Sequence, residues 1–270
     1  MVALSVQPAL SHLRPFRLRH VFDQLHAAPV RRRAAAQPDD LRRRRDGVRD
    51  ALCAIPHVSP AARRLSFVTF RGARAGDPAA ILQPPFFNPN ADAAVNFGAI
   101  GGVIGHEMTH GFDDSGAQFD GDGNLTDWWT AEDKTNFEKA TKSLASQYDK
   151  YEPVKDVHVN GTFTNGENIA DLGGVNIAFD ALQMYLKDKG NPGKIDGYTP
   201  EQRFFLSWAT VWRTLSTDKY MSNQVKTDPH SPGFFRSFGP LVNTDAFYKA
   251  FDLKEGDKLY KKPEERIKIW

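Results

Sequence analysis

The composition of the chain changes abruptly near Pro78, and this change restricts the folded part to the residues that follow. Residues 1–75 hold 15 Arg, no Lys and five acidic residues, a net charge of +10, whereas the remainder holds all 16 Lys and carries −8. Residues 1–77 also show no sustained apolar period of 2 or 3.6. Because burial cannot offset the entropy of ordering such a segment, we predict that residues 1–77 are a disordered, Arg-rich extension.

The basic segment raises other hypotheses about partners and compartment. Arg-rich runs at residues 31–33 and 42–45 could bind nucleic acid, but they lie in a segment that we expect to be unfolded, and we predict no nucleic-acid partner. The first 20 residues lack the apolar core of a secretory signal, and no run approaches the ~20 apolar residues that span a bilayer. We expect no signal peptide and no membrane span here, and a secreted, periplasmic or cytoplasmic location and the oligomeric state stay open.

From Pro78 onward the pattern predicts a single α+β domain, mainly helical, at residues 78–270. Apolar periodicity and capping residues predict helices at about 93–112, 130–151, 167–187, 199–215 and 244–251. The segment VHVNGTFT, residues 157–164, alternates like a short strand or hairpin. The single cysteine, Cys53, excludes an intrachain disulfide.

The motif HEMTH, residues 106–110, places two histidines four positions apart. On a helix this spacing puts His106 and His110 about 40° apart around the axis, so both imidazoles can bind one metal ion. Glu107 can then take the proton of a zinc-bound water, whose pKa is lowered towards ~7, as that water attacks a carbonyl. Ordinary residue frequencies produce the pattern by chance in about one percent of chains of this length, so the motif alone does not decide the function.

A second motif, ENIAD at residues 167–171, supplies a ligand that the first lacks. A catalytic zinc has three protein ligands and one open position, and two histidines with one glutamate are an established set. Glu167 fits as the third ligand, and Asp171 can accept the free ring N–H of a ligating histidine. The alternative for Glu167 is an acidic residue favoured at a helix N-terminus by the helix dipole. Beside the histidine pair, the metal hypothesis is the stronger one.

From about Pro78 to Trp270 the sequence contains several long motifs: ILQPPFF, VIGHEMTHGFDDSGAQFDGDGNLTDWW, NGENIADLGG, KTDPHSPGFFRSFGPL and the terminal Trp270. In these motifs it resembles the neprilysin and endothelin-converting-enzyme family of zinc peptidases. It implies a thermolysin-like zincin catalytic domain that holds one Zn²⁺ per chain. It also implies a zinc-dependent metalloendopeptidase that hydrolyses oligopeptides, preferably before hydrophobic residues, with peptide substrates as its partners.

The resemblance assigns roles to individual residues. The implied zinc ligands and their catalytic neighbours are His106, His110, Glu167, Glu107 and Asp171. His230, oriented by Asp228, is implied to stabilise the tetrahedral oxyanion, although a lone histidine in a polar loop is otherwise a solvated surface residue. Arg236 is implied to bind a substrate backbone carbonyl. The implied hydrophobic pocket is lined by Ile81, Phe86, Val103 and Trp212, and plain core packing is an equal alternative for Ile81 and Val103.

The sequence departs from this family before Pro78. A full-length member has several hundred further residues there, including a helical lobe that covers the active site, and an Asn-Ala-x-Tyr segment that holds the peptide extended. This chain has Leu65-Ser66-Phe67-Val68 at that place. We therefore expect a truncated catalytic domain without the covering lobe, in which metal binding is a safer expectation than efficient catalysis. The alternative hypothesis is a non-catalytic, zinc-binding remnant of such a peptidase.

Overall fold

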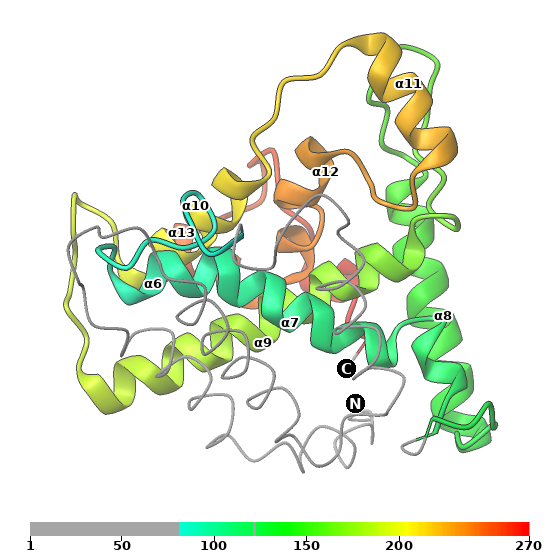
Figure 1. The fold of residues 1–270 in the computed structure, drawn as a ribbon, viewed down its shortest axis with the longest axis horizontal. Coiled ribbons are helices and arrows are strands. Elements are labelled where there is room, and N and C mark those ends of the chain that lie inside the picture. Colours follow the sequence, from blue (N-terminus) through cyan, green and yellow to red (C-terminus); the bar gives the residue numbers. More distant parts are fainter. Residues whose placement is uncertain (1–80, 121–122, 270) are drawn as a thin grey trace, which may run out of the picture.

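The computed structural model describes residues 81–120 and 123–269, and these residues are mainly helical (Figure 1). The predictions for residues 1–77 lie outside them. The helical elements are α6 (Ala93–Asn96), η1 (Phe97–Gly101), α7 (Gly102–Thr109), η2 (His110–Phe112), η3 (Gly116–Gln118), α8 (Ala131–Tyr148), α9 (Asn165–Lys189), α10 (Pro200–Val211), α11 (Asp218–Thr227), α12 (Gly233–Phe238), η4 (Leu241–Asn243), α13 (Asp245–Phe251) and η5 (Pro263–Glu265). The β-structure within the described ranges consists of three isolated bridges. None of the described helices combines the length and apolarity needed to cross a membrane.

The predicted helix at 93–112 is present as one helical run with three geometries. It begins at Asp92, whose carboxylate accepts the Ala94 N–H at 3.0 Å, and the segment η1 is π-helical. Because a π-helical turn shifts the backbone pairing, the Ile100 N–H is able to donate to the Phe86 carbonyl at 3.0 Å. This bond fixes the loop that contains Phe86 beside the helix carrying the HEMTH motif.

Two further helices begin at the predicted capping residues. The Thr130 hydroxyl accepts the Asp133 N–H at the start of α8. At the start of α10, Thr199 and Gln202 form a reciprocal capping box with Pro200 as the first helical residue. These bonds satisfy backbone donors that a helix N-terminus leaves unpaired, which is why the side chains could be identified from sequence.

The helix ends were predicted less well. Helix α8 ends at Tyr148 rather than near 151, and Tyr151 instead packs its ring flat against Phe235, with centroids 4.8 Å apart. Helix α10 ends at Val211 rather than near 215, and the following Trp212 packs its ring against the Arg236 guanidinium. In both cases a tertiary contact, which local sequence does not encode, coincides with the end of the helix.

The prediction of a strand at residues 157–164 is wrong. Val157 forms an isolated bridge with Val154, and residues 161–164 form turns. Side chains bind the backbone of this part: Asp149 accepts the Gly161 N–H at 2.7 Å, and Asn160 accepts the Phe163 N–H at 2.9 Å. The helices α11 and α12 were not predicted. Helix α11 is mostly exposed, and α12 has six residues, so neither carries a long apolar period.

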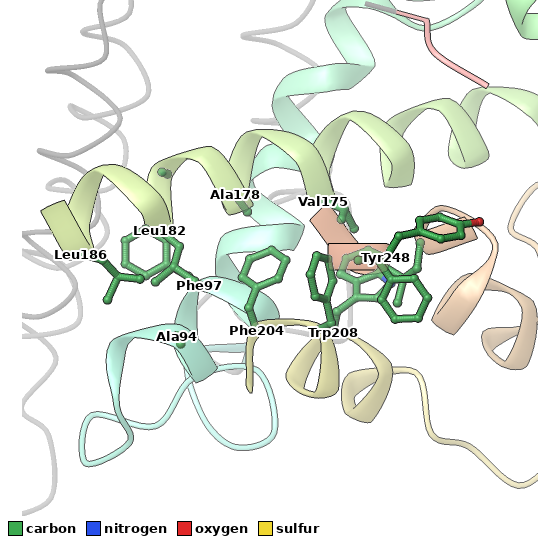
Figure 2. Close-up of a cluster of buried hydrophobic side chains, with 13 residues drawn as sticks. Ala94, Phe97, Val175, Ala178, Leu182, Leu186, Phe204, Trp208 and Tyr248 are labelled. Atoms are coloured by element: carbon green, nitrogen blue, oxygen red, sulfur yellow. The ribbon is translucent and has the colours of Figure 1, made fainter. Parts of the chain in front are cut away.

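Helix α9 belongs to both hydrophobic clusters of the domain. Its C-terminal half packs against α6, η1, α10 and α13, where Phe204 and Trp208 fill the space below Val175 and Leu182 (Figure 2). Its N-terminal half contributes Ile169 and Leu172 to a second cluster, with residues of α8, α11, α12 and the C-terminal segment. The end of α9 that carries Glu167 is therefore held between packed helices on both sides.

Glycines allow α7 and α9 to cross at very short range near the centre of the molecule (Figure 1). A Cβ at Gly105 would lie 2.7 Å from the Gly174 carbonyl oxygen, and a Cβ at Gly174 would lie 2.5 Å from the His106 backbone nitrogen. Both distances are far below van der Waals contact, so no larger residue fits at this crossing. The close crossing brings the start of α9 next to His106 of α7 and His110 of η2.

Candidate metal centre

Three side chains, from α7, η2 and α9, converge on one point. The Nε2 atoms of His106 and His110 lie 3.0 Å apart, and Glu167 Oε2 lies 3.1 Å from the first and 3.6 Å from the second. All three residues form the candidate metal-binding group. For a triangle with these edges, a point about 2 Å from every corner exists, which matches zinc bonds of about 2.0–2.2 Å to nitrogen and oxygen. The predicted ligands therefore come together in a geometry that fits zinc.

Asp171 forms a hydrogen bond with the ring nitrogen of His106 that faces away from Glu167. Its Oδ1 lies 2.8 Å from His106 Nδ1, and the carboxylate is fully buried. Arg236 donates to both oxygens of Asp171 at 2.8 Å through Nε and Nη2, so this carboxylate stays ionised and fixed. When the Nδ1–H is donated to Asp171, the Nε2 lone pair of His106 faces the site, as a metal ligand requires.

Asp113 holds the second histidine in the same way, and sequence reasoning missed it. Its Oδ2 lies 2.7 Å from His110 Nδ1, while its Oδ1 accepts the N–H groups of Ser115 and Gly116 at 2.8 and 2.6 Å. The signal was present in the sequence, because an aspartate three residues after His110 can reach its ring as the helix ends. If both rings are neutral and donate their Nδ1–H groups to the aspartates, the two Nε2 lone pairs face each other at 3.0 Å, and a cation between them would relieve the repulsion.

The charges around the three converging side chains also favour a positive charge between them. Burial lowers the pKa of His110, but hydrogen bonds to Asp113 and Glu167 outweigh burial and raise that pKa to about 10. Burial would raise the pKa of Glu167, yet hydrogen bonds from His106, His110 and His230 lower it well below its usual range. Either protons on the imidazoles or a bound cation must therefore balance the carboxylates.

His230 lies at the same site, and Glu107 follows His106 directly on α7. Glu107 is 6% exposed. His230, on the loop between α11 and α12, places Nε2 3.1 Å from Glu167 Oε2 and Nδ1 2.7 Å from Asp228 Oδ1. Hydrogen bonding to Glu167 raises the pKa of His230 against the lowering effect of burial. This environment favours an imidazolium, which donates from both ring nitrogens.

The side chains predicted to line a pocket are all half-buried, and one of them, Trp212, contacts a residue of the site. Trp212 lies under Arg236, whose guanidinium carbon is 3.8 Å from the ring centroid, and Phe86 is fixed to η1 through its carbonyl. Ile81 and Val103 are half-buried on the Phe86 loop and on α7. Arg236 is 7% exposed, with Nε and Nη2 committed to Asp171, so Nη1 is the part of the guanidinium left for a further partner.

Comparisons with known proteins find zinc peptidases that are similar to this chain. The sequence model of peptidase family M13 matches residues 76–267. Human neprilysin is 43% identical over 197 residues, which cover 72% of this chain and 26% of neprilysin. Human endothelin-converting enzyme 1 is 40% identical over 195 residues, covering 72% of this chain and 25% of that protein. The structure of the Mycobacterium tuberculosis zinc metalloprotease Zmp1 with an inhibitor is 54% identical, with a TM-score of 0.69, and the match covers 72% of this chain and 30% of Zmp1.

The chain spans about a quarter of the length of the curated relatives that it matches. The matched region nevertheless contains the whole candidate metal centre, from His106 of α7 and His110 of η2 through α9 to Arg236 of α12. The mainly helical fold and its arrangement agree with the solved relatives. The family match covers well over half of the chain, and the chain belongs to peptidase family M13.

Proposed function

We propose that this chain is a zinc-dependent metalloendopeptidase that hydrolyses peptide bonds of oligopeptides. The observation that carries the proposal is the convergence of His106 Nε2, His110 Nε2 and Glu167 Oε2 within 4.8 Å of one another. Two neutral imidazoles and one carboxylate are a donor set typical of catalytic zinc, which retains an open position. Zinc bound there supplies an electrophile that polarises a carbonyl group and eases deprotonation of water.

In this proposal Glu107 is the general base. It follows a metal ligand directly on α7 and is buried, so its carboxylate has little competition from bulk water. A carboxylate in this position can take the proton of the attacking water and pass it to the leaving amine. Asp113 and Asp171 keep the ring nitrogens of both histidines oriented while the charge in the site changes.

His230 is the proposed donor to the oxyanion. Its raised pKa favours the imidazolium form, and Asp228 fixes the orientation of the ring at Nδ1. The Nε2–H then points into the site, where it can stabilise negative charge as this charge develops on the carbonyl oxygen. The proposed substrate contacts are Arg236 Nη1 for a backbone carbonyl and the half-buried Ile81, Phe86, Val103 and Trp212 for a hydrophobic side chain after the cleaved bond.

The test combines metal content with turnover. The full chain is purified, and its zinc content and its cleavage of an internally quenched peptide are measured. The peptide has a hydrophobic residue after the scissile bond. We expect about one zinc per chain, loss of cleavage with a chelator and recovery with zinc. Glu107→Gln should keep the zinc and lose cleavage, while the exposed Glu132→Gln on α8 should change neither.

Two outcomes would contradict the proposal. Ordinary turnover by Glu107→Gln would show that Glu107 is not the base. A zinc-loaded, folded chain that cleaves no peptide in a library would instead support the hypothesis of a non-catalytic zinc-binding remnant.

A further inference from the structure

The loop that carries His230 is joined to α9 by a buried hydrogen bond between two residues that have no role in the proposed chemistry. The Ser231 hydroxyl donates to Asn168 Oδ1 at 2.8 Å, and each residue is 1% exposed. Ser231 follows His230 in sequence, and Asn168 follows Glu167. The bond therefore connects the chain neighbours of two residues whose side chains approach to 3.1 Å at the metal centre.

The surroundings fix the direction of this bond. The Asn168 Nδ2 group donates to Thr164 Oγ1 at 2.9 Å, and the Thr164 hydroxyl donates its one proton to the Asn160 carbonyl at 3.0 Å. Thr164 must therefore accept from the amide nitrogen, so the amide oxygen faces the loop and Ser231 is the donor. Asn168 is held in one orientation at the start of α9.

The loop has a further contact with α9, from His230 Nε2 to Glu167 Oε2 at 3.1 Å, and this is the contact that the loop must position. The remaining contacts of the loop do not replace the bond from Ser231 to Asn168. Asp228 orients the ring of His230 at 2.7 Å, but it belongs to the same loop and cannot fix that loop to α9. Arg236 binds Asp171 of α9, but it lies five residues beyond Ser231, on α12. The side chain of His230 is 42% exposed, so packing restrains it weakly.

We propose that Asn168 and Ser231 are positioning residues for His230. They hold the loop at the distance from α9 at which the imidazole can reach the oxyanion of a substrate bound at the metal centre. This inference rests on the function proposed above for His230. Because the oxyanion forms in the transition state, a displaced donor lowers kcat more than it raises KM.

The expected loss of kcat can be estimated from the effect of removing or displacing an oxyanion donor. Removing a whole oxyanion donor costs about 10²–10³ in kcat, and a misplacement of about 1 Å costs on the order of 10²-fold. Ser231→Ala keeps the imidazole of His230 but removes the hydrogen bond that holds its loop to α9. We therefore expect a loss of about 10–100-fold in kcat, little change in KM and full zinc content. Ser231→Thr keeps the hydroxyl and should recover much of the loss.

The test compares Ser231→Ala with a matched serine on the same segment. Ser237→Ala on α12 removes an exposed hydroxyl that bonds to Phe234 O and should behave like the unmodified chain. The double variant of Ser231→Ala and His230→Ala should be no slower than His230→Ala alone, because Ser231 acts through His230. Additive losses, or normal turnover by Ser231→Ala, would overturn the inference.

A structural measurement separates this inference from the proposed function. Crystal structures of the Ser231→Ala and Ser237→Ala chains should show the His230 ring displaced or disordered in the first and ordered in the second. If the unmodified chain has no zinc-dependent peptidase activity, the proposed function fails, and the two structures still decide whether Ser231 positions His230. An unmoved, well-ordered His230 in Ser231→Ala overturns the inference at any level of activity.

Discussion

Replacing Gly174 by alanine tests whether the close crossing of α7 and α9 sets the geometry of the metal centre. The added Cβ would lie 2.5 Å from the His106 backbone nitrogen and 2.7 Å from the Gly102 carbonyl oxygen, whereas ordinary contacts begin near 3.4 Å. Both neighbours are backbone atoms that cannot rotate away, so the helices must separate by about 0.9 Å, with an overpacking cost of about 1–3 kcal/mol in folding free energy. Zinc sites tolerate changes of about 0.2 Å in ligand distance.

We therefore expect Gly174→Ala to weaken zinc binding at least about ten-fold, because His106 and Glu167 lie on the two helices that separate. The dissociation constant can be measured by competition with a chromophoric chelator. Gly193→Ala is the control: its φ is 74° and a Cβ there meets nothing within 4 Å, so it should cost about 1–2 kcal/mol of stability through strain and leave zinc affinity unchanged. Unchanged zinc affinity in Gly174→Ala would refute the argument from the helix crossing.

Two further predictions concern the histidine ligands. Asp113→Asn should weaken zinc binding by about 10–100-fold in the same titration, since the charged acceptor of the His110 Nδ1–H is lost, and unchanged affinity would contradict this role. The folded-state pKa of His110 is raised to about 10, so its proton stabilises the metal-free fold below the unfolded pKa of about 6.5, and this stability is lost as pH rises towards 10. Thermal denaturation should show this loss with EDTA and not with saturating zinc, which replaces the proton; parallel pH dependences would contradict it.

The parts of the fold that could be predicted are those that local sequence determines. Thr130 and Thr199 mark helix starts because their hydroxyls satisfy backbone donors a few residues away. Helix α9 packs on two hydrophobic clusters, and this requires a long run of periodic apolar residues, from which the helix could be predicted. The segment at 157–164 was mistaken for a strand because the deciding bond, from Gly161 to Asp149, joins residues 12 positions apart.

The candidate metal centre also has parts that could be predicted and parts that could not. Helical spacing predicted His106 and His110 as a pair of ligands, and the need for a third ligand predicted Glu167. The π-helical turn and the close crossing of α7 and α9 could not be predicted, because each depends on a tertiary contact. The π-helical turn depends on the backbone of Phe86, and the crossing depends on the backbone of Gly174. Among the polar supports, Asp171 was predicted and Asp113 could have been found from its position three residues after His110, whereas the bond from Ser231 to Asn168 joins residues 63 positions apart.

The central claim is that one zinc ion is bound by two histidines and one glutamate at the crossing of α7 and α9. Zinc X-ray absorption on the purified full chain tests it most directly, with the unmodified chain compared with Glu167→Ala. The account predicts two imidazole nitrogens and oxygen ligands at about 2.0–2.2 Å, no sulfur, and a loss of bound zinc in Glu167→Ala. A sulfur ligand, a single imidazole, or full zinc occupancy with unchanged coordination in Glu167→Ala would contradict it.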